Sequence, residues 1–370
     1  MSKPITTYIG LGSNLGDRES YIDGALKRLA EAEHIETVNV SDIIETVALA
    51  STEQPKFLNA VAELKTTLSA ADLHKTLTDI ENELGRTRRG QWWPRTIDLD
   101  LLLFGAEILN SPDLTVPHPQ IQLRSFVLKG LCQLNGELLH PVMKVSFDEL
   151  SARLNGCDFA LAPDKPQLVS IAGNIGVGKT TLAKKLADRL GTDLLLEPYD
   201  ENPFLPEVYA GKKELALDSE LYFLTSRAKQ LDADKLEIGR MCIYDCVFDK
   251  ELIYAGRLLN AQQLALHEEI YPLFAAKVAE PVLVVYMRDP VENCLQRIHS
   301  RNRPYEQQIE LQFLRELDSD YEQLFDHWKS CPVIRISTSQ STDVDRLANQ
   351  IKYYTAGNFI VASAAEQFKM

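Results

Sequence analysis

"LVSIAGNIGVGKTTLAKKLADRL", residues 168–190, decides the fold of the larger half of the chain. A short apolar run typical of a buried strand leads into a glycine-rich turn and then into an amphipathic helical repeat. Residues 173–180 match the pattern G-x-x-x-x-G-K-[ST] in full. Glycines at this spacing let backbone N–H groups wrap a phosphate, and the N-terminus of the following helix adds positive potential. The stretch therefore predicts a phosphate-binding loop between a strand and a helix.

The residues of this loop are expected to hold ATP together with one Mg²⁺. Lys179 is expected to reach the outer phosphates, and Thr180 to bind the metal ion. The predicted nucleotide-binding set is Gly173, Asn174, Gly176, Gly178, Lys179, Thr180 and Thr181.

Apolar segments on the C-terminal side of this loop alternate with helical repeats. Strands are predicted near 168–172, 194–197, 241–245, 282–287 and 332–336. Strands that alternate with helices are typical of a parallel, doubly wound α/β domain.

A different pattern precedes the loop. Residues 155–167, "NGCDFALAPDKPQ", combine Asn-Gly with two prolines and indicate a linker. We therefore predict a first domain at 1–158, a linker at 159–167 and a second domain at 168–370. In the first domain strands are expected at 5–12, 36–46, 57–67 and 95–104, and helices at 17–32, 70–84 and 124–134. The order β-α-β-β-α-β predicts a ferredoxin-like α+β fold.

Composition narrows the function classes. Of the 370 residues, 45% are apolar and 25% charged, as in ordinary globular proteins. Residues 1–160 carry 15 basic and 22 acidic side chains and the remainder 24 and 31, so each part has a net charge of −7. Neither part has the basic excess of a nucleic-acid or membrane arm, and no apolar run approaches the ~20 residues of a membrane span. Six cysteines without a C-x-x-C pair favour buried, reduced thiols and a cytoplasmic location over a metal or redox site.

An acidic pair interrupts the predicted strand in "PRTIDLDLLLFG", residues 94–105. Asp98 and Asp100 are two residues apart, so a strand directs both carboxylates to one face. At ~6–7 Å they repel by about 2–3 kcal/mol at an effective dielectric of ~20. Two explanations are open: a solvated edge strand whose charges deter aggregation, or a cation between the carboxylates.

The preceding loop favours the cation. Residues 85–95, "GRTRRGQWWPR", combine arginines with two tryptophans. Guanidinium groups suit polyphosphates, and indole rings suit a flat heterocycle. Paired carboxylates beside such a loop indicate a site where Mg²⁺ and nucleotide phosphates meet.

The first half resembles the 6-hydroxymethyl-7,8-dihydropterin pyrophosphokinases of folate biosynthesis over about residues 5–155. The resemblance is carried by "YIGLGSNLGDR" (8–18), "FLNAV" (57–61), "PRTIDLDLLLFG" (94–105) and "LTVPHPQIQLRSF" (114–126). It implies that the terminal pyrophosphate of ATP is moved to the hydroxymethyl oxygen of the pterin and AMP is released.

The same resemblance implies residue roles. Asp98 and Asp100 would hold two Mg²⁺ ions, and Arg86 and Arg95 would clamp phosphates on a loop that closes with the help of Trp92. Other implied positions are His118 and Arg124 on the ATP side and Phe57, Asn59 and Phe126 around the pterin. Glu81 corresponds to an acid behind the metal site, with a solvated helix face as the alternative. The segment "TVALAST" (46–52) lacks an expected proline, which puts one wall of the pterin pocket in doubt.

The second half is similar to deoxynucleoside kinases over about residues 168–355. The similarity is carried by "EPYDENPFLPEVYAG" (197–211), "ELYFLTSRAKQL" (220–231), "YDCVFDKELIYA" (244–255) and "RIHSRNRPYEQQIELQFL" (297–314). It implies a general base at Glu197, a Mg²⁺-binding acid at Asp245, phosphate-gripping arginines at Arg297, Arg301 and Arg303, sugar-binding residues Tyr209 and Glu306, and a base-site arginine at Arg227.

Two residues depart from the sequence pattern of this family. Cys246 stands where members carry an arginine, and Asp218 stands near the position of a base-reading glutamine. Either Arg240 or the arginine-rich lid supplies the missing charge, or the base preference and rate have changed.

The favoured hypothesis is a bifunctional transferase with two ATP–Mg²⁺ sites, acting on a pterin and a deoxynucleoside, with a homodimer through the kinase half. One alternative makes the second half a nucleotide-binding or dimerisation module with little activity. Another makes the whole chain a single unrelated ATPase.

Overall fold

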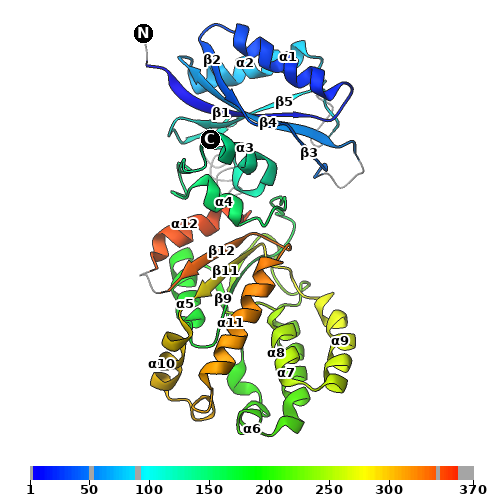
Figure 1. Cartoon of the computed structure of the whole chain (residues 1–370), viewed down its shortest axis with the longest axis vertical. Coiled ribbons are helices and arrows are strands. Elements are labelled where there is room, and N and C mark those ends of the chain that lie inside the picture. Colours follow the sequence, from blue (N-terminus) through cyan, green and yellow to red (C-terminus); the bar gives the residue numbers. More distant parts are fainter. Residues whose placement is uncertain (1–2, 50–53, 88–92, 339–341, 357–370) are drawn as a thin grey trace, which may run out of the picture. The chain divides into compact units, whose positions relative to one another are not determined.

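The computed structural model describes residues 3–49, 54–87, 93–338 and 342–356. The chain divides into two compact units, Met1–Ala160 and Leu161–Met370, each with its own sheet (Figure 1). Within the described segments, no helix is both long and apolar enough to cross a membrane.

The first unit is built on an antiparallel sheet with the order β2-β4-β1-β5, and β3 also pairs with β4. Its strands are β1 (Ile5–Ser13), β2 (Ile35–Val40), β3 (Ile44–Thr46), β4 (Phe57–Thr66), β5 (Asp98–Phe104), and the small pair β6 (Leu109–Asn110) and β7 (Thr115–Val116). Its helices are α1 (Arg18–Glu31), α2 (Ala70–Glu83), η1 (Ile121–Leu123), α3 (Ser125–Asn135) and α4 (Phe147–Ala152). The ferredoxin-like prediction is confirmed, because the four main strands have the order and directions of a split β-α-β pair.

Helices cover the two faces of this sheet differently. Helices α1 and α2 lie together on one face of the sheet (Figure 1). Their residues Leu29, Leu73 and Leu77 belong to the same buried cluster as Leu99 and Leu101 of β5. The alternate residues of β5, which include both aspartates, therefore face the other side of the sheet. Helix α3 lies on that side against β4 (Figure 1).

One strand prediction is wrong. The expected strand 36–46 is two strands, because the ladder with β4 breaks at Ser41. The Ser41 hydroxyl accepts the N–H of Val61 at 2.9 Å. The register then shifts by one residue, from Val40 opposite Ala62 to Ile44 opposite Asn59.

The second unit has a parallel sheet with the order β12-β11-β8-β10-β9. Its strands are β8 (Gln167–Gly173), β9 (Asp193–Leu195), β10 (Met241–Tyr244), β11 (Leu283–Arg288) and β12 (Val333–Ser337). Its helices are α5 (Lys179–Leu190), η2 (Tyr199–Glu201), α6 (Leu205–Tyr209), η3 (Lys213–Leu215), α7 (Ala216–Gln230), α8 (Lys250–Leu258), α9 (Ala261–Ala275), α10 (Val291–Arg301), η4 (Pro304–Glu306), α11 (Leu311–Asp326) and α12 (Val344–Tyr354). The prediction of a parallel α/β domain is confirmed.

The strand order positions the site of this unit. Strand β8 is central, and the next strand in the chain, β9, lies beyond β10 rather than beside β8. Such a switch in strand order opens a crevice at the carboxyl ends of the strands, where ligands of open α/β sheets bind. The ring of Tyr286 in β11 packs against the rings of Tyr321 and Phe325 in α11, which fixes this helix to the sheet.

Candidate functional site

Two glycines open the face of the first sheet above the acidic pair. Register places Asp98 opposite Gly12 and Asp100 opposite Gly10 of β1. A Cβ on Gly12 would lie 3.1 Å from Asn59 Oδ1, so any other residue would crowd this face. A cavity of about 80 Å³ lies here. Its lining contains Gly10, Gly12, Thr46, Phe57, Asn59, Arg95, Asp98, Asp100, His118, Arg124 and Phe126.

Asp98 is the electrostatic centre of this cavity. Its two oxygens form ion pairs with Arg86 at 2.5 Å and with Arg95 at 2.6 Å. Burial, and after it the charge of Asp100, raise the pKa of Asp98 to about 6. The charge of Asp100 therefore disfavours the ionised form of Asp98, and a cation placed between the two carboxylates would reverse that effect.

This donor set fits Mg²⁺. Oxygen ligands suit the ion, which keeps few protein ligands and fills its remaining positions with phosphate and water. In the described parts of the chain, no group of three or more His, Cys, Asp or Glu residues that could hold a metal occurs.

Glu81 is buried behind the pair, so the solvated helix face is excluded. It accepts the backbone N–H of Leu99 at 2.7 Å and forms an ion pair with Arg86. Burial raises its pKa to about 7. Glu81 thus ties α2 to the first residues of β5 and orients Arg86.

The other predicted residues of this site lie around the same cavity. Asn59 donates from Nδ2 to Thr46 Oγ1 at 2.8 Å, which joins β4 to β3. The Arg95 guanidinium lies 5.9 Å from the centre of the Phe57 ring. Burial lowers the pKa of His118. Trp92 and residues 50–52 of the doubtful wall lie outside the described residues.

At two glycines, the phosphate-binding loop of the second unit approaches neighbouring backbone too closely for a side chain. A Cβ on Gly173 would lie 2.4 Å from the Met287 carbonyl oxygen, and one on Gly176 would lie 2.5 Å from that of Cys294. Lys179 Nζ donates to the carbonyl oxygens of Gly173 and Asn174, each at 2.9 Å. Burial, and next the charge of Lys250, lower the pKa of Lys179 to about 8.

Acidic residues stand directly beside this loop. Thr180 Oγ1 donates to Asp245 Oδ2 at 2.7 Å, and the other Asp245 oxygen accepts the backbone N–H of Glu197 at 2.8 Å. A hydroxyl and a buried carboxylate at a phosphate-binding loop form a donor set that fits Mg²⁺. Both acids line a cavity of about 590 Å³ together with the loop.

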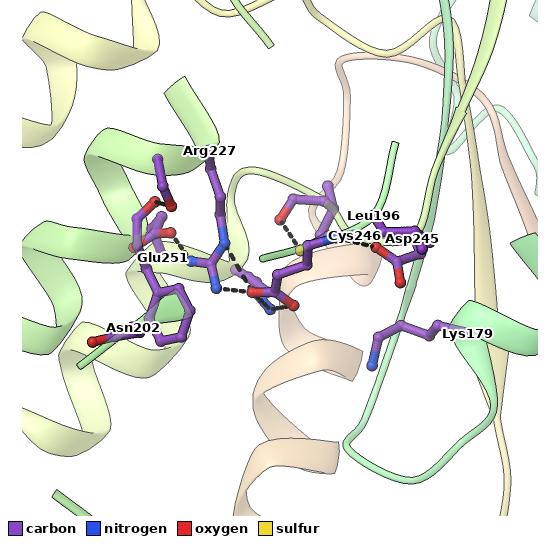
Figure 2. A network of polar contacts seen from close by, with 12 residues as sticks. Lys179, Leu196, Asn202, Arg227, Asp245, Cys246 and Glu251 are labelled. Atoms are coloured by element: carbon purple, nitrogen blue, oxygen red, sulfur yellow. Dashed lines mark hydrogen bonds and ion pairs between the residues drawn. The ribbon is translucent and has the colours of Figure 1, made fainter. Parts of the chain in front are cut away.

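Glu197 is held by two cations. Arg227 donates to its Oε1 from Nε at 3.0 Å, and Lys250 Nζ lies 2.7 Å from each of its oxygens. Arg227 also forms an ion pair with Glu251 (Figure 2). Burial opposes ionisation of Glu197, but Arg227 and then Lys250 outweigh it and hold its pKa well below the usual range. Figure 2 shows Arg227 and Glu251 on one side of this network and Asp245 and Lys179 on the other.

The arginines of the predicted lid meet Glu306. Arg301 Nε lies 2.5 Å from Glu306 Oε2, and Arg303 Nη1 lies 3.3 Å from Oε1. Arg303 also stacks on the Tyr199 ring, 4.1 Å from its centre. Tyr209 lines the same cavity. The lid thus faces the phosphate-binding loop across the cavity.

Two predicted nucleotide ligands point elsewhere. The Asn174 side chain donates to the Leu314 carbonyl oxygen at 2.7 Å and accepts the N–H of Ile175 at 2.8 Å, so it fixes the loop to α11. Arg297 forms an ion pair with Asp289 and donates to the Gly176 carbonyl oxygen at 3.2 Å. Neither side chain lines the cavity, and neither does Gly173.

Known proteins resemble each unit separately. Residues 8–136 match the family 7,8-dihydro-6-hydroxymethylpterin-pyrophosphokinase (HPPK), and residues 169–355 match the family deoxynucleoside kinase. The 2-amino-4-hydroxy-6-hydroxymethyldihydropteridine pyrophosphokinase of Bacillus subtilis is 40% identical over 147 residues, which cover 40% of this chain and 88% of that one. The deoxyguanosine kinase of the same organism is 36% identical over 157 residues, 42% of this chain and 76% of that one.

The chain belongs to both families. Its first unit is an HPPK domain and its second a deoxynucleoside kinase domain. A solved structure of deoxyadenosine kinase from M. mycoides with bound dATP is 22% identical to this chain, with a TM-score of 0.44, over 50% of this chain and 98% of that one.

Of the two sources of charge considered for the position of Cys246, the lid arginines Arg301 and Arg303 line the cavity and Arg240 does not. Arg240 precedes β10 and pairs with Asp193 and Glu237 on the surface, at the opposite end of the strand from the site. Lys250, which the sequence analysis did not single out, lines the cavity and pairs with Glu197. The only sequence signal for it was its place five residues after Asp245, at the start of a helix.

Asp218, which stands near the position of the family's base-reading glutamine, does not line the cavity. Asp218 is exposed, whereas Glu220, two residues further along α7 and on nearly the opposite side of the helix, is buried and lines the cavity. Among the described residues, Glu220 Oε2 has no hydrogen-bond partner. Burial raises its pKa to about 7.

Proposed function

We propose that this chain is a bifunctional ATP-dependent transferase. Its HPPK domain transfers pyrophosphate from ATP to 6-hydroxymethyl-7,8-dihydropterin and releases AMP. Its kinase domain transfers the γ-phosphoryl group of ATP to the 5′-hydroxyl of a deoxynucleoside and releases ADP. The observation that carries the proposal is that each domain brings its own acids and arginines into one cavity.

In the HPPK domain, we assign two Mg²⁺ ions to Asp98 and Asp100. Mg²⁺ bound there supplies charge neutralisation for the triphosphate and the acceptor oxygen. Arg86 and Arg95 bind phosphate oxygens, and Phe57 and Phe126 hold the flat pterin, whose edge Asn59 recognises. His118 and Arg124 bind the ATP side of the same cavity, and Trp92 helps to exclude water.

In the kinase domain, the loop from Gly173 to Thr181 binds the ATP phosphates, with one Mg²⁺ held by Thr180 and Asp245. Glu197 accepts the proton of the 5′-hydroxyl as the new O–P bond forms. Arg301 and Arg303 neutralise the transferring group, while Arg297 acts on the loop through Gly176. Tyr209 and Glu306 bind the sugar, and Arg227 lies behind the base.

The module alternative is not favoured. Glu197, Asp245, Thr180 and Lys179 line one cavity with the lid arginines, which is more than nucleotide binding requires. The single-ATPase alternative does not fit two units of different fold and family.

An acceptor screen tests both activities at once. The chain is supplied with ATP and Mg²⁺ and, separately, with the hydroxymethyldihydropterin and each of four deoxynucleosides, with AMP and ADP measured independently. We expect AMP only with the pterin and ADP with at least one deoxynucleoside. ADP release without any acceptor, or AMP release without the pterin, would contradict the assignment.

We further propose a cytoplasmic homodimer that pairs through the kinase domain. The six cysteines form no disulfide, as expected in a reducing compartment. Leu266 and Leu273 of α9 are 45% and 68% exposed, which offers apolar area for a partner copy. Sedimentation of the wild type and of Leu273→Asp tests this.

A further inference from the structure

Lys250 occupies a position that does not favour a lysine. It is the first residue of α8, where the helix dipole disfavours positive charge. Its side chain is only 8% exposed, and lysines are rarely buried unless they are paired. A specific partner must therefore offset these costs.

That partner is Glu197. Lys250 Nζ lies 2.7 Å from both oxygens of the carboxylate and 5.3 Å from the centre of the Tyr254 ring. Arg227 also contacts Glu197, but it shares its charge with the buried Glu251. Lys250 is thus the cation that balances Glu197, and the four groups together are neutral.

Cys246, the residue after Asp245, carries no positive charge, so a cation near Glu197 must come from another residue. Cys246 is 1% exposed, and its Sγ contacts the Val247 carbonyl oxygen at 3.4 Å. A thiol offers no positive charge to the neighbouring carboxylates. Cys246 lies beside Asp245 in the same network, so a cation in its place would enter the same group of charges (Figure 2).

We propose that Lys250 is a positioning residue of the nucleoside-kinase reaction, holding Glu197 toward the acceptor hydroxyl and supplying the positive charge that is missing at Cys246. This inference rests on the proposed kinase function. During transfer, the bond between Pγ and the β,γ-bridging oxygen breaks, the O5′–Pγ bond forms, and the 5′-hydroxyl proton passes to Glu197. Without Lys250, Arg227 is left as the cation among the described residues that is paired with Glu197 and Glu251 when the triphosphate arrives.

Four variants of the full chain test this proposal: Lys250→Met, Lys250→Arg, Cys246→Arg and the double variant Cys246→Arg/Lys250→Met. Lys250→Met keeps most of the side-chain volume and removes the charge. We expect its kcat for the preferred deoxynucleoside to fall by about 10²–10³-fold, the usual effect of losing one preorganised charge, with KM for the nucleoside changed less than about threefold. Lys229→Met, at an exposed lysine of α7, is the matched control and should keep the wild-type rate.

Restoration of kcat by a second cation distinguishes a positioning role of Lys250 from a role in stability alone. We expect Lys250→Arg to retain at least a tenth of the wild-type kcat, and the double variant to exceed Lys250→Met by at least tenfold. The melting temperature and pterin-dependent AMP formation report folding of each variant. If Lys250→Met is folded and keeps the wild-type kcat, or if it loses activity and neither Lys250→Arg nor the double variant restores any, the proposal is overturned.

Wild-type behaviour separates this proposal from the proposed function. A wild type that phosphorylates a deoxynucleoside supports the kinase assignment whatever the variants do. An inactive wild type that becomes active on Cys246→Arg alone would overturn the inference and keep the kinase assignment, since Lys250 would then not supply the charge. If neither protein has activity, both proposals fall.

Discussion

The two domains arrange charge around ATP in opposite ways. In the HPPK domain, the candidate site is a set of side chains on an antiparallel sheet, opened by Gly10 and Gly12 and centred on Asp98. In the kinase domain, the phosphate site is mainly backbone, folded against β11 and α10 so closely that Gly173 and Gly176 admit no side chain. A site built from side chains depends on single carboxylates, whereas a backbone loop depends on a conformation. Although both domains are expected to bind ATP, the substitutions that should impair them most therefore differ between the two.

The largest effect is expected at Asp98. Asp98→Asn keeps the shape but removes the charge that pairs with Arg86 and Arg95 and that would bind the metal. We expect pterin-dependent AMP formation to fall by about 10³-fold or more, with nucleoside phosphorylation unchanged. The exposed Asp113→Asn is the control. Loss of both activities in a folded Asp98→Asn protein would break the picture of two independent sites.

The kinase domain has its counterpart in Glu197→Gln. The amide keeps hydrogen bonding with Arg227 but can no longer accept the 5′-hydroxyl proton. We expect deoxynucleoside-dependent ADP formation to fall by about 10²–10⁴-fold while nucleotide binding, measured by calorimetry, persists. Exposed Glu201→Gln is the matched control. A Glu197→Gln variant with wild-type turnover would favour the module hypothesis again.

A smaller effect is expected from filling the glycine strip of the HPPK domain. Gly12→Ala places a Cβ 3.1 Å from Asn59 Oδ1, so this amide must move. We expect the KM for the pterin to rise about tenfold, equivalent to about 1.4 kcal/mol. Gly10→Ala makes no contact closer than 3.6 Å and should raise KM less. Equal effects of the two variants would contradict a specific role for Asn59.

The last prediction concerns the pH dependence of stability rather than activity. Burial raises the pKa of Glu220 to about 7, against about 4.3 for a glutamate in an unfolded chain. The folded domain therefore binds this proton more tightly. The resulting stabilisation is complete below pH about 4 and is lost as the pH rises through about 7.

Relative to Glu220→Gln, the wild-type kinase domain should lose up to about 3 kcal/mol in free energy of unfolding between pH 5 and pH 8. Hydrogen exchange, which reports each domain separately, measures this. Exposed Glu214→Gln should follow the wild type. A pH profile unchanged by Glu220→Gln would show that this carboxyl is already ionised in the folded domain at pH 5.

Most of the architecture followed from local patterns. The alternation of strands and helices predicted both folds because apolar periodicity reflects burial directly. The break at Ser41 was missed because a side-chain hydroxyl took over a ladder hydrogen bond, which no periodicity records. Trp92 lies outside the described residues, so its predicted role remains a prediction.

The sites were predictable where a motif fixes the geometry. The structure brings Asp98 and Asp100 to one cavity and Lys179 and Asp245 to the other. Strand spacing or the loop pattern pointed to the first three, and the family resemblance pointed to Asp245. Arg240, one of the sources considered for the charge absent at Cys246, does not line the cavity and pairs with Asp193 and Glu237 instead. Arg240 precedes β10, whereas Asp245 and Cys246 follow it, so the length of the strand separates Arg240 from the cavity.

The sequence by itself determined that there are two domains of different fold, each with acids and cations suited to a polyphosphate. These properties depend on the spacing of residues that are close together in the chain. Only the tertiary structure decided which charges meet. It buried Glu81 behind Asp98, turned Asn174 and Arg297 away from the cavity, and brought Lys250 to Glu197 across 53 positions of chain. Pairing of charges depends on distances between elements, and those distances are set by how helices pack on a sheet rather than by the order of residues.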